Sequence, residues 1–311
     1  MAFALVFPGQ GSQSVGMMAG YGESAPIRET FAEASGALGE DLWQMIAEGP
    51  AERLALTVNT QPLMLTAGVA AYRAWQAAGG PKPALVAGHS LGEYSALVVA
   101  DALSFVDAVP LVRFRAQAMQ EAVPAGQGAM AALMGLEVDE ARAACIEASQ
   151  GEVVEAANLN APGQIVIAGA KTAVERAIEL ATAKGAKRAV LLPVSAPFHC
   201  ALMKPAAERL KERLATVKIA KPEIDVLNNV DVAVYDDPEK IRDALVRQAF
   251  SPVRWIESVA AMAARGLSHV IECGPGKVLA GMTRRISKDV SGGSLHDAAS
   301  LEQIISTMRA A

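Results

Sequence analysis

The sequence predicts an α/β fold in which a small subdomain interrupts a large layered domain. Short apolar runs alternate with longer helical ones from residue 1 to 123, as in a sheet covered by helices. Between residues 124 and 195 the order becomes that of a ferredoxin-like (βαββαβ) unit. The α/β pattern then resumes. We therefore expect a discontinuous large domain of residues 1–123 and 196–311 around a small subdomain of residues 124–195, with the ligand site in the cleft between them.

Local signals justify the elements of the large domain. Residues 2–7 form an unbroken apolar run, which favours a buried strand. Ser104 and Asp107 resemble a capping box at the start of a helix, and Pro110 inside that helix is expected to kink it. The expected strands cover residues 2–7, 84–87 and 269–272, and the expected helices cover residues 62–78, 91–100, 104–123 and 204–214.

The small subdomain begins after a turn rich in proline and glycine at residues 124–128. Apolar runs of strand length then alternate with two segments of helical periodicity. The expected strands cover residues 129–134, 153–157, 164–168 and 188–194, and the expected helices cover residues 138–148 and 171–184.

The composition excludes several classes of protein. With 311 residues, 52% of them hydrophobic and 20% charged, the chain can bury a large core. No apolar run approaches the length of a membrane span, and a net charge of -5 argues against nucleic-acid binding. Cys145, Cys200 and Cys273 are widely spaced and odd in number, which fits a reducing cytoplasm and offers no metal-ligand pattern.

The most informative motif places Ser90 inside G-x-S-x-G, directly after an apolar strand and before a helix. This order is that of a nucleophile elbow, so the large domain is expected to be α/β-hydrolase-like. The tight turn tolerates only small residues around the serine, and Gly88 and Gly92 supply them. The amides that begin the helix favour negative charge beside Ser90. The alternative is a glycine-rich connection with a buried serine.

A serine nucleophile needs a base, and the chain offers four histidines. His89 adjoins Ser90 and should point elsewhere, His269 is expected to pack at the edge of a strand, and no role is assigned to His296. His199 remains, in the loop where the small subdomain rejoins the large domain. The alternative is a loop histidine without a catalytic role.

The loop of residues 7–13 follows the first strand and contains two glycines, which let its amides approach a ligand closely. It is a candidate for one half of an oxyanion hole, and the Leu91 amide, next to the nucleophile, is the candidate for the other half. The alternative is an ordinary turn between a strand and a helix.

Arg115 is the most diagnostic charged residue. Helical spacing puts it on an apolar stripe with Val112 and Met119, whereas Arg113 faces the opposite way. A buried guanidinium needs an anion, preferably one that binds it with two hydrogen bonds. No acidic residue of this helix is spaced to pair with it. A carboxylate of the ligand fits, and a structural pair with a distant Asp or Glu is the alternative.

Two further motifs suggest other sites. Residues 273–277 follow a strand and precede a helix, as in a phosphate-binding loop, but they lack both G-x-G-x-x-G and the G-K-[ST] ending. Cys200 beside His199 suggests a cysteine nucleophile, although sequence neighbours rarely reach that geometry.

These motifs together resemble a known family. Residues 7–13, residues 88–94, Arg115 with Met119, Asn160, Phe198 with His199, and residues 274–277 occur in the family's order. The chain resembles the malonyl-CoA:acyl carrier protein transacylases of bacterial type II fatty acid synthesis over essentially its full length.

The resemblance implies a ping-pong acyl transfer. Ser90 would attack the malonyl thioester with His199 as base, and the phosphopantetheine thiol of acyl carrier protein would then take the malonyl group. The Gln10 and Leu91 amides would hold the oxyanion. A backbone carbonyl near Gln248 would orient the histidine in place of an acidic triad partner.

The same resemblance implies the substrate contacts. Arg115 would bind the malonyl carboxylate, with Asn160, Met119 and Phe198 in the acyl site, and the bulk of Phe198 would favour malonyl over methylmalonyl. No cofactor or metal is expected beyond the substrates malonyl-CoA and phosphopantetheinylated acyl carrier protein. The protein is expected to be a cytoplasmic monomer that binds neither nucleic acid nor membrane.

Two rival functions remain open from the sequence. A serine thioesterase or esterase of α/β-hydrolase type would use the same Ser90 and His199, and a CoA- or nucleotide-binding regulator would use residues 274–277. The sequence also leaves open whether the product enters fatty acid or polyketide synthesis.

Overall fold

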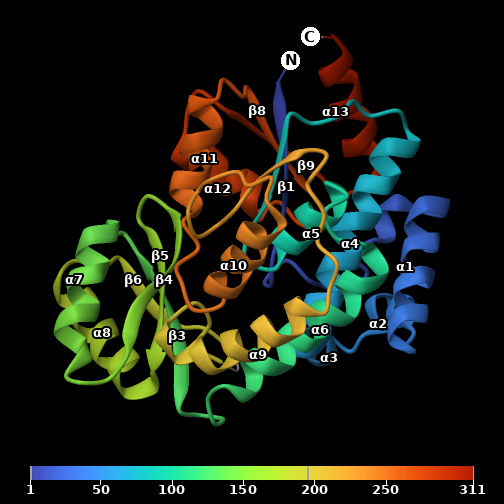
Figure 1. Ribbon diagram of the computed structural model, residues 1–311. Coiled ribbons are helices and arrows are strands. Elements are labelled where there is room, and N and C mark those ends of the chain that lie inside the picture. Colours follow the sequence, from blue (N-terminus) through green and yellow to red (C-terminus); the bar gives the residue numbers. More distant parts are fainter. Residues whose placement is uncertain (1, 195, 311) are drawn as a thin grey trace.

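The computed structural model describes residues 2–194 and 196–310. Its centre is a parallel sheet of five strands in the order β7-β2-β1-β8-β9, flanked by helices on both faces (Figure 1). The predicted α/β class is confirmed. The strands are β1 (Phe3–Phe7), β2 (Leu85–Gly88), β7 (Asp225–Leu227), β8 (His269–Cys273) and β9 (Ser291–Leu295).

Both faces of this sheet are buried, which explains why β1 is apolar at every position. Successive side chains of a strand point to opposite faces. Leu5 and Phe7 accordingly pack in the core beneath the helices that precede residue 124 and those near the C-terminus. Ala4 and Val6 pack on the other face, beneath α11 (Trp255–Ala264) and α12 (Val278–Ile286). The helices around the sheet are α1 (Ala25–Leu38), α2 (Leu42–Glu48), α3 (Ala51–Ala55), α4 (Thr57–Ala77), α5 (Gly92–Val99), α6 (Phe105–Glu121), α9 (Lys204–Ala215), α10 (Pro238–Gln248), α11 (Trp255–Ala264), α12 (Val278–Ile286) and α13 (Ala298–Ala310), with 3-10 turns η1 (Ala19–Tyr21) and η2 (Ala201–Met203).

Helix α4 begins five residues before its predicted start at Pro62. Proline is common in the first turn of a helix, which made Pro62 a plausible first residue, but Thr57 and the residues after it are already helical. The Thr66 hydroxyl donates to the Pro62 carbonyl at 2.7 Å. At the start of α6 the N-cap half of the predicted capping box is confirmed, because Ser104 Oγ accepts from the Asp107 amide at 3.2 Å. The reciprocal bond to the Ser104 amide is not formed among the described residues, and Asp107 Oδ2 instead accepts from the Ser104 hydroxyl at 2.6 Å.

The residues of the predicted small subdomain form a separate antiparallel sheet in the order β4-β5-β3-β6, beside the large sheet (Figure 1). The predicted βαββαβ order is confirmed, and α7 and α8 cover one face of this sheet with its own apolar core. The boundaries at residues 123/124 and 195/196 stay a prediction, and Ser195 itself lies outside the described residues. The elements are β3 (Gly128–Met134), α7 (Val138–Ser149), β4 (Val154–Ala161), β5 (Gln164–Ala170), α8 (Lys171–Ala183) and β6 (Arg188–Leu191).

All four strands of this small sheet differ in length from the prediction, and β4 and β6 differ most. Strand β4 continues to Ala161 because it pairs with β5 as far as Ala161 and Gln164. It also bonds to the large domain: the Leu159 amide donates to the Val253 carbonyl, and the Val253 amide donates to the Ala157 carbonyl, each at 2.9 Å. Strand β6 ends at Leu191. The Leu192 amide still donates to the Met130 carbonyl of β3 at 2.9 Å, but Leu192 and Val194 line a cavity.

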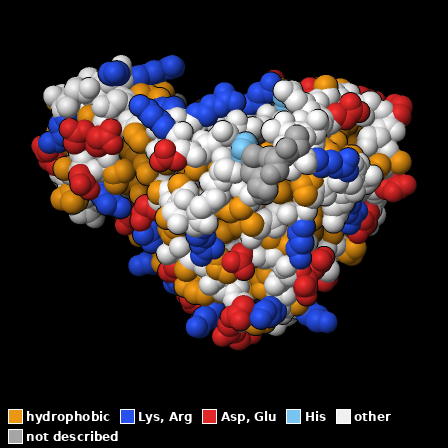
Figure 2. Space-filling view, turned by 90° about the horizontal axis from the view of Figure 1, so that it is seen from above, with side chains coloured by type: hydrophobic (Ala, Val, Ile, Leu, Met, Phe, Trp, Pro, Cys, Tyr) orange, Lys and Arg blue, Asp and Glu red, His pale blue; other side chains and the backbone are white. Residues whose placement is uncertain are grey.

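The two ends of the chain lie on one side of the molecule (Figure 1). Figure 2 looks onto that side, where basic and acidic side chains are both present and are spread over the surface. The parallel strands run away from this side, so the residues that follow β1 and β2 lie at the opposite edge of the sheet. Among the described residues, no helix is both long enough and apolar enough to cross a lipid bilayer.

Candidate active site

Ser90 lies in a strained turn between β2 and α5, with φ of +52°. Such a backbone conformation is uncommon for any residue except glycine and is often found at functional sites. The turn is also closely packed. A Cβ on Gly88 would lie 1.8 Å from the Gly92 carbonyl carbon, and one on Gly92 would lie 2.0 Å from the Phe7 carbonyl oxygen. The predicted elbow and the need for both glycines are confirmed.

The structure brings His199 to Ser90 across 109 positions of sequence, with 2.7 Å between His199 Nε2 and Ser90 Oγ. On the other side of the ring, His199 Nδ1 lies 2.9 Å from the Gln248 backbone carbonyl. A carbonyl only accepts hydrogen bonds, so Nδ1 carries the proton and Nε2 is free to accept the serine proton. This position of the Gln248 carbonyl is the one expected from the resemblance.

His199 is neutral at ordinary pH. Burial, and secondly the positive charge of Arg115, lower its pKa to about 3. The residue also has a positive φ, +61°. A neutral imidazole in this orientation can act as a general base toward the Ser90 hydroxyl.

Arg115 is buried, with 2% of its surface exposed, and it contacts the nucleophile directly. Its Nη2 donates to Ser90 Oγ at 3.1 Å and to Gln248 Oε1 at 2.9 Å, and its Nη1 donates to Gln61 Oε1 at 2.8 Å. Its Nε has no hydrogen-bond partner among the described residues. The centre of the guanidinium lies 5.4 Å from the Tyr94 ring centroid.

No ion pair holds Arg115 among the residues that the structure describes. The structural pair with a distant Asp or Glu, which the sequence left open, is therefore not formed. Glu93 acts on the charge of Arg115 from beyond hydrogen-bond distance. A buried cation whose hydrogen-bond partners are all neutral retains an attraction for an anion beside Ser90. Burial lowers the pKa of Arg115, because removal from water disfavours the charged form.

Ser90 and His199 open onto a cavity of about 120 Å³. Gln10 and Leu91 line it, and within the described chain neither backbone amide donates to another protein group, so both are available to a ligand. Met119 and Phe198 are also in its wall, as predicted for the acyl site. The remaining lining residues are Gln61, His89, Arg115, Met130, Asn158, Val166, Leu192 and Val194.

Asn160 is placed differently from the other predicted substrate contacts. It does not line this cavity, and its Oδ1 lies 2.8 Å from His89 Nε2. The His89 ring in turn lies 5.6 Å from the Trp255 ring, between centroids. Because the amide oxygen is already bonded to His89, Asn160 contacts the site through that ring.

The rival nucleophile, Cys200, is unsuited to that role. Its thiol donates to the Pro197 carbonyl, with sulfur and oxygen 3.1 Å apart, and burial raises its pKa to about 12. A thiol in this state holds its proton and is a weak nucleophile. Neither His269 nor His296 lines the cavity.

Sequence reasoning missed three residues that organise the site. Gln61 from α4 accepts a hydrogen bond from Arg115 Nη1. Asn229, from the loop after β7, accepts one from the Ser90 amide. The third, Glu93, is 2% exposed, and burial raises its pKa to about 7. A signal for Glu93 was present, because it is the only charged residue in the apolar run that forms α5.

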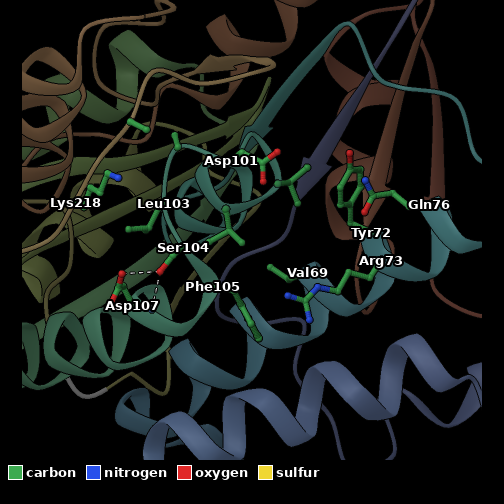
Figure 3. Close-up of a pocket in the computed structure, with 14 residues that line it drawn as sticks. Val69, Tyr72, Arg73, Gln76, Asp101, Leu103, Ser104, Phe105, Asp107 and Lys218 are labelled. Atoms are coloured by element: carbon green, nitrogen blue, oxygen red, sulfur yellow. Dashed lines mark hydrogen bonds between the residues drawn. The ribbon is translucent and has the colours of Figure 1, made fainter.

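A larger cavity of about 400 Å³ lies at the far end of α4 and α5 (Figure 3). Three of its polar side chains bond to protein groups: Asp107 binds Ser104, and Arg73 pairs with Glu33 at 2.6 Å. Its lining contains Ser104 but no histidine. Catalytic geometry therefore points to the smaller cavity beside Ser90.

Comparisons with known proteins identify the family. The sequence profile of the acyl transferase domain matches residues 4–309. The malonyl CoA-acyl carrier protein transacylase of Escherichia coli (strain K12) is 57% identical over 296 residues, which are 95% of this chain and 96% of that protein. The chain belongs to the malonyl CoA-acyl carrier protein transacylase family.

Solved structures of this transacylase family agree in fold. The acyl-carrier-protein S-malonyltransferase of Burkholderia pseudomallei 1710b has a TM-score of 0.97 and 61% identity, covering 98% of this chain and 100% of that one. A second structure shows a type II PKS acyl-carrier protein in complex with its malonyl-transacylase. It has a TM-score of 0.97 and 49% identity, and covers 99% of this chain and 100% of that one.

Proposed function

We propose that the protein transfers the malonyl group of malonyl-CoA to the phosphopantetheine thiol of acyl carrier protein, which supplies the extender unit for fatty acid synthesis. One observation carries this proposal beyond the family: a serine–histidine pair is in direct contact with a buried arginine that has no anionic partner among the described residues. The pair suits acyl transfer, and the arginine suits an acyl group that ends in a carboxylate.

In the first half-reaction, Ser90 Oγ attacks the thioester carbonyl while His199 Nε2 takes its proton. The carbonyl oxygen becomes an oxyanion, which the Leu91 and Gln10 amides bind. The intermediate then collapses: the carbon–sulfur bond breaks, the proton on His199 passes to the departing CoA sulfur, and a malonyl ester remains on Ser90. The Gln248 carbonyl holds the imidazolium that exists between these steps.

The second half-reaction reverses these roles. His199 takes the proton of the phosphopantetheine thiol, the sulfur attacks the ester carbonyl, and Ser90 leaves with the proton returned by His199. Every step is proton transfer and acyl exchange, so we infer that the substrates suffice and no cofactor takes part. The rival thioesterase would differ only in the acceptor, which would be water.

Selectivity follows from the walls of the cavity. A malonyl carboxylate can pair with Arg115, whereas an acetyl group leaves that charge without an anion. Met119 and Phe198 supply bulk beside it, which favours malonyl over a branched methylmalonyl group. Asn160 supports this wall through His89.

We also infer the setting of the protein. Cys145, Cys200 and Cys273 are free and buried, which is consistent with a reducing cytoplasm. We also propose that the protein acts as a monomer and binds neither nucleic acid nor membrane.

The decisive experiment is the intact mass of the protein seconds after mixing with malonyl-CoA, with acetyl-CoA in parallel. We expect a mass increase of one malonyl group that is discharged by phosphopantetheinylated acyl carrier protein and absent in Ser90→Ala. Free malonate and CoA without transfer to the carrier would show a hydrolase. If the protein forms no adduct and turns over no substrate, the result would favour a binding protein.

A further inference from the structure

The elbow around Ser90 is held by two buried amide side chains from distant segments. Asn229 Oδ1 accepts from the Ser90 amide at 2.8 Å, and Asn229 Nδ2 donates to the Gly88 carbonyl at 2.7 Å. Gln248 Nε2 donates to the Ser90 carbonyl at 3.0 Å. Three backbone groups of a strained, partly buried turn are thus satisfied by side chains, where an unmade bond would be destabilising.

One carboxylate oxygen joins these two residues. Glu93 Oε2 accepts from the Asn229 backbone amide at 3.0 Å and from Gln248 Nε2 at 2.9 Å. Asn229 and Gln248 are both 0% exposed, so no solvent can replace this acceptor. Two donors that converge on one oxygen fix the positions of the segments that carry them.

The same network reaches the groups that do the chemistry. Gln248 Oε1 accepts from Arg115 Nη2, and the Gln248 backbone carbonyl binds His199 Nδ1. The Gln248 amide can serve Ser90, Glu93 and Arg115 together in one orientation only, with its NH₂ toward the two acceptors and its oxygen toward the arginine. Glu93 selects this orientation because it offers an acceptor.

We propose that Glu93 is a positioning residue for the transfer reaction, which through Asn229 and Gln248 fixes the Ser90 elbow, and with it the alignment of Ser90, His199 and Arg115. The inference rests on the function proposed above. Its essential feature is the position of the acceptor oxygen, since that oxygen receives both hydrogen bonds.

Substitutions at Glu93 separate this role from a merely structural one. Glu93→Gln keeps an acceptor at the same reach, Glu93→Asp withdraws it by one methylene, and Glu93→Ala removes it. The matched control is Glu272, another buried glutamate, whose Oε2 accepts from the Ala280 amide and touches no part of the elbow.

Two rates are measured per folded protein, with the folded fraction taken from thermal unfolding. One is malonyl-ester formation from malonyl-CoA, and the other is labelling of Ser90 by a fluorophosphonate probe, which needs the nucleophile but no malonyl group. We expect Glu93→Ala and Glu93→Asp to lower both rates by about tenfold or more, as displaced catalytic groups do. Glu93→Gln should remain within a few-fold of the parent, with kcat affected more than KM, and Glu272→Ala should label at the parental rate.

The outcomes are separable from failure of the proposed function. If the parent protein labels with the probe but forms no malonyl ester, the function is wrong, and the labelling rates still test Glu93. Parental labelling of Glu93→Ala would overturn the inference, as would equal slowing in Glu272→Ala. If Glu93→Ala does not fold, the labelling rates of Glu93→Gln and Glu93→Asp are compared instead. A fast Glu93→Asp beside a slow Glu93→Gln would overturn the inference, because the charge and not the position of the acceptor would then set the rate.

Discussion

Arg115 Nη2 lies 3.1 Å from Ser90 Oγ, so the cation expected to select the acyl group touches the atom expected to carry it. The two residues come from different elements, α6 and the elbow before α5. This contact limits the acyl groups that fit: an anionic end must lie within reach of the guanidinium while the carbonyl carbon remains at Ser90.

Replacement of Arg115 should therefore change selectivity as well as rate. We expect Arg115→Ala to lower kcat/KM for malonyl-CoA by the equivalent of about 2–5 kcal/mol, the usual loss when a buried charged partner is removed, with a much smaller effect for acetyl-CoA. Steady-state kinetics with both thioesters measure this. Arg113→Ala is the control, because Arg113 lies on the same helix but pairs with Glu40. An unchanged preference for malonyl over acetyl in Arg115→Ala would contradict the assignment.

The pH dependence of Ser90 reactivity should reflect the low pKa of His199. A base works only when unprotonated, and burial together with Arg115 lowers the pKa of this histidine from 6.5 to about 3. Labelling by a fluorophosphonate should therefore stay constant as pH falls through 6.5 and decline only at much lower pH. In Arg115→Ala the second-largest of the causes that lower this pKa is gone, so the decline should begin at higher pH. Labelling rates between about pH 4 and 8 test both statements. A decline centred near 6.5 in the parent would show that the histidine is not buried as described.

Glycine at the elbow should contribute strongly to the stability of the fold. A methyl group on Gly88 would lie 1.8 Å from a backbone carbon of Gly92, which no side-chain rearrangement relieves. We expect Gly88→Ala to lower the free energy of unfolding by about 3 kcal/mol or more, at the upper end of the usual range for point mutations. Gly281→Ala is the matched control, because nothing lies within 4 Å of that site in α12. It should stabilise the helix by about 0.5–1 kcal/mol. Chemical denaturation measures both, and equal stabilities would refute the close packing.

Glu272 should make stability depend on pH. Burial raises its pKa from 4.5 to about 7, despite bonds from the amides that begin α12. The folded state thus holds a proton that the unfolded state releases above pH 4.5, so the contribution of this group is fully present below 4.5 and is lost as pH rises through 7. Glu272→Gln cannot ionise. Its free energy of unfolding relative to the parent should therefore rise with pH, by up to about 3 kcal/mol above about pH 7. If the difference in free energy of unfolding between Glu272→Gln and the parent does not depend on pH, the raised pKa of Glu272 is refuted.

A carrier protein of acidic character would dock on a locally basic surface. Two groups of basic residues are candidates, and they are not equivalent. In the first, which also includes Lys288, the Arg284 and Arg285 side chains already bind the backbone carbonyls of Gly292 and Pro162. Neither group forms an ion pair within the described part of the chain, and both are exposed, but no side-chain hydrogen bond there ties down Lys187 or Arg188, which form the second group. The second group is therefore the better candidate.

We expect reversal of charge at Lys187 and Arg188 to raise KM for the carrier protein severalfold while the rate of malonyl-ester formation stays unchanged. The measurement is steady-state transfer at varied carrier concentration, beside a single-turnover acylation. An unaltered KM would exclude this patch.

The sequence by itself determined the features that depend on local geometry. The G-x-S-x-G motif after an apolar strand predicted the elbow, because its packing allows no side chain at Gly88 or Gly92. The helical period predicted the burial of Arg115, because the residues that share its face are apolar. Likewise, the alternation of strand and helix predicted the small sheet.

Only the tertiary structure decided how the site is held. The acceptors and donors around Ser90 and Arg115 come from Gln61, Asn229 and Gln248, which belong to segments far apart in the chain. No local period indicates which of many polar residues will meet. The ends of strands were decided in the same way, since Leu192 and Val194 look like strand residues but line the cavity. The physical reason is that a buried polar group must find a partner wherever the packed fold provides one, and that partner is set by the contact between elements rather than by the sequence around it.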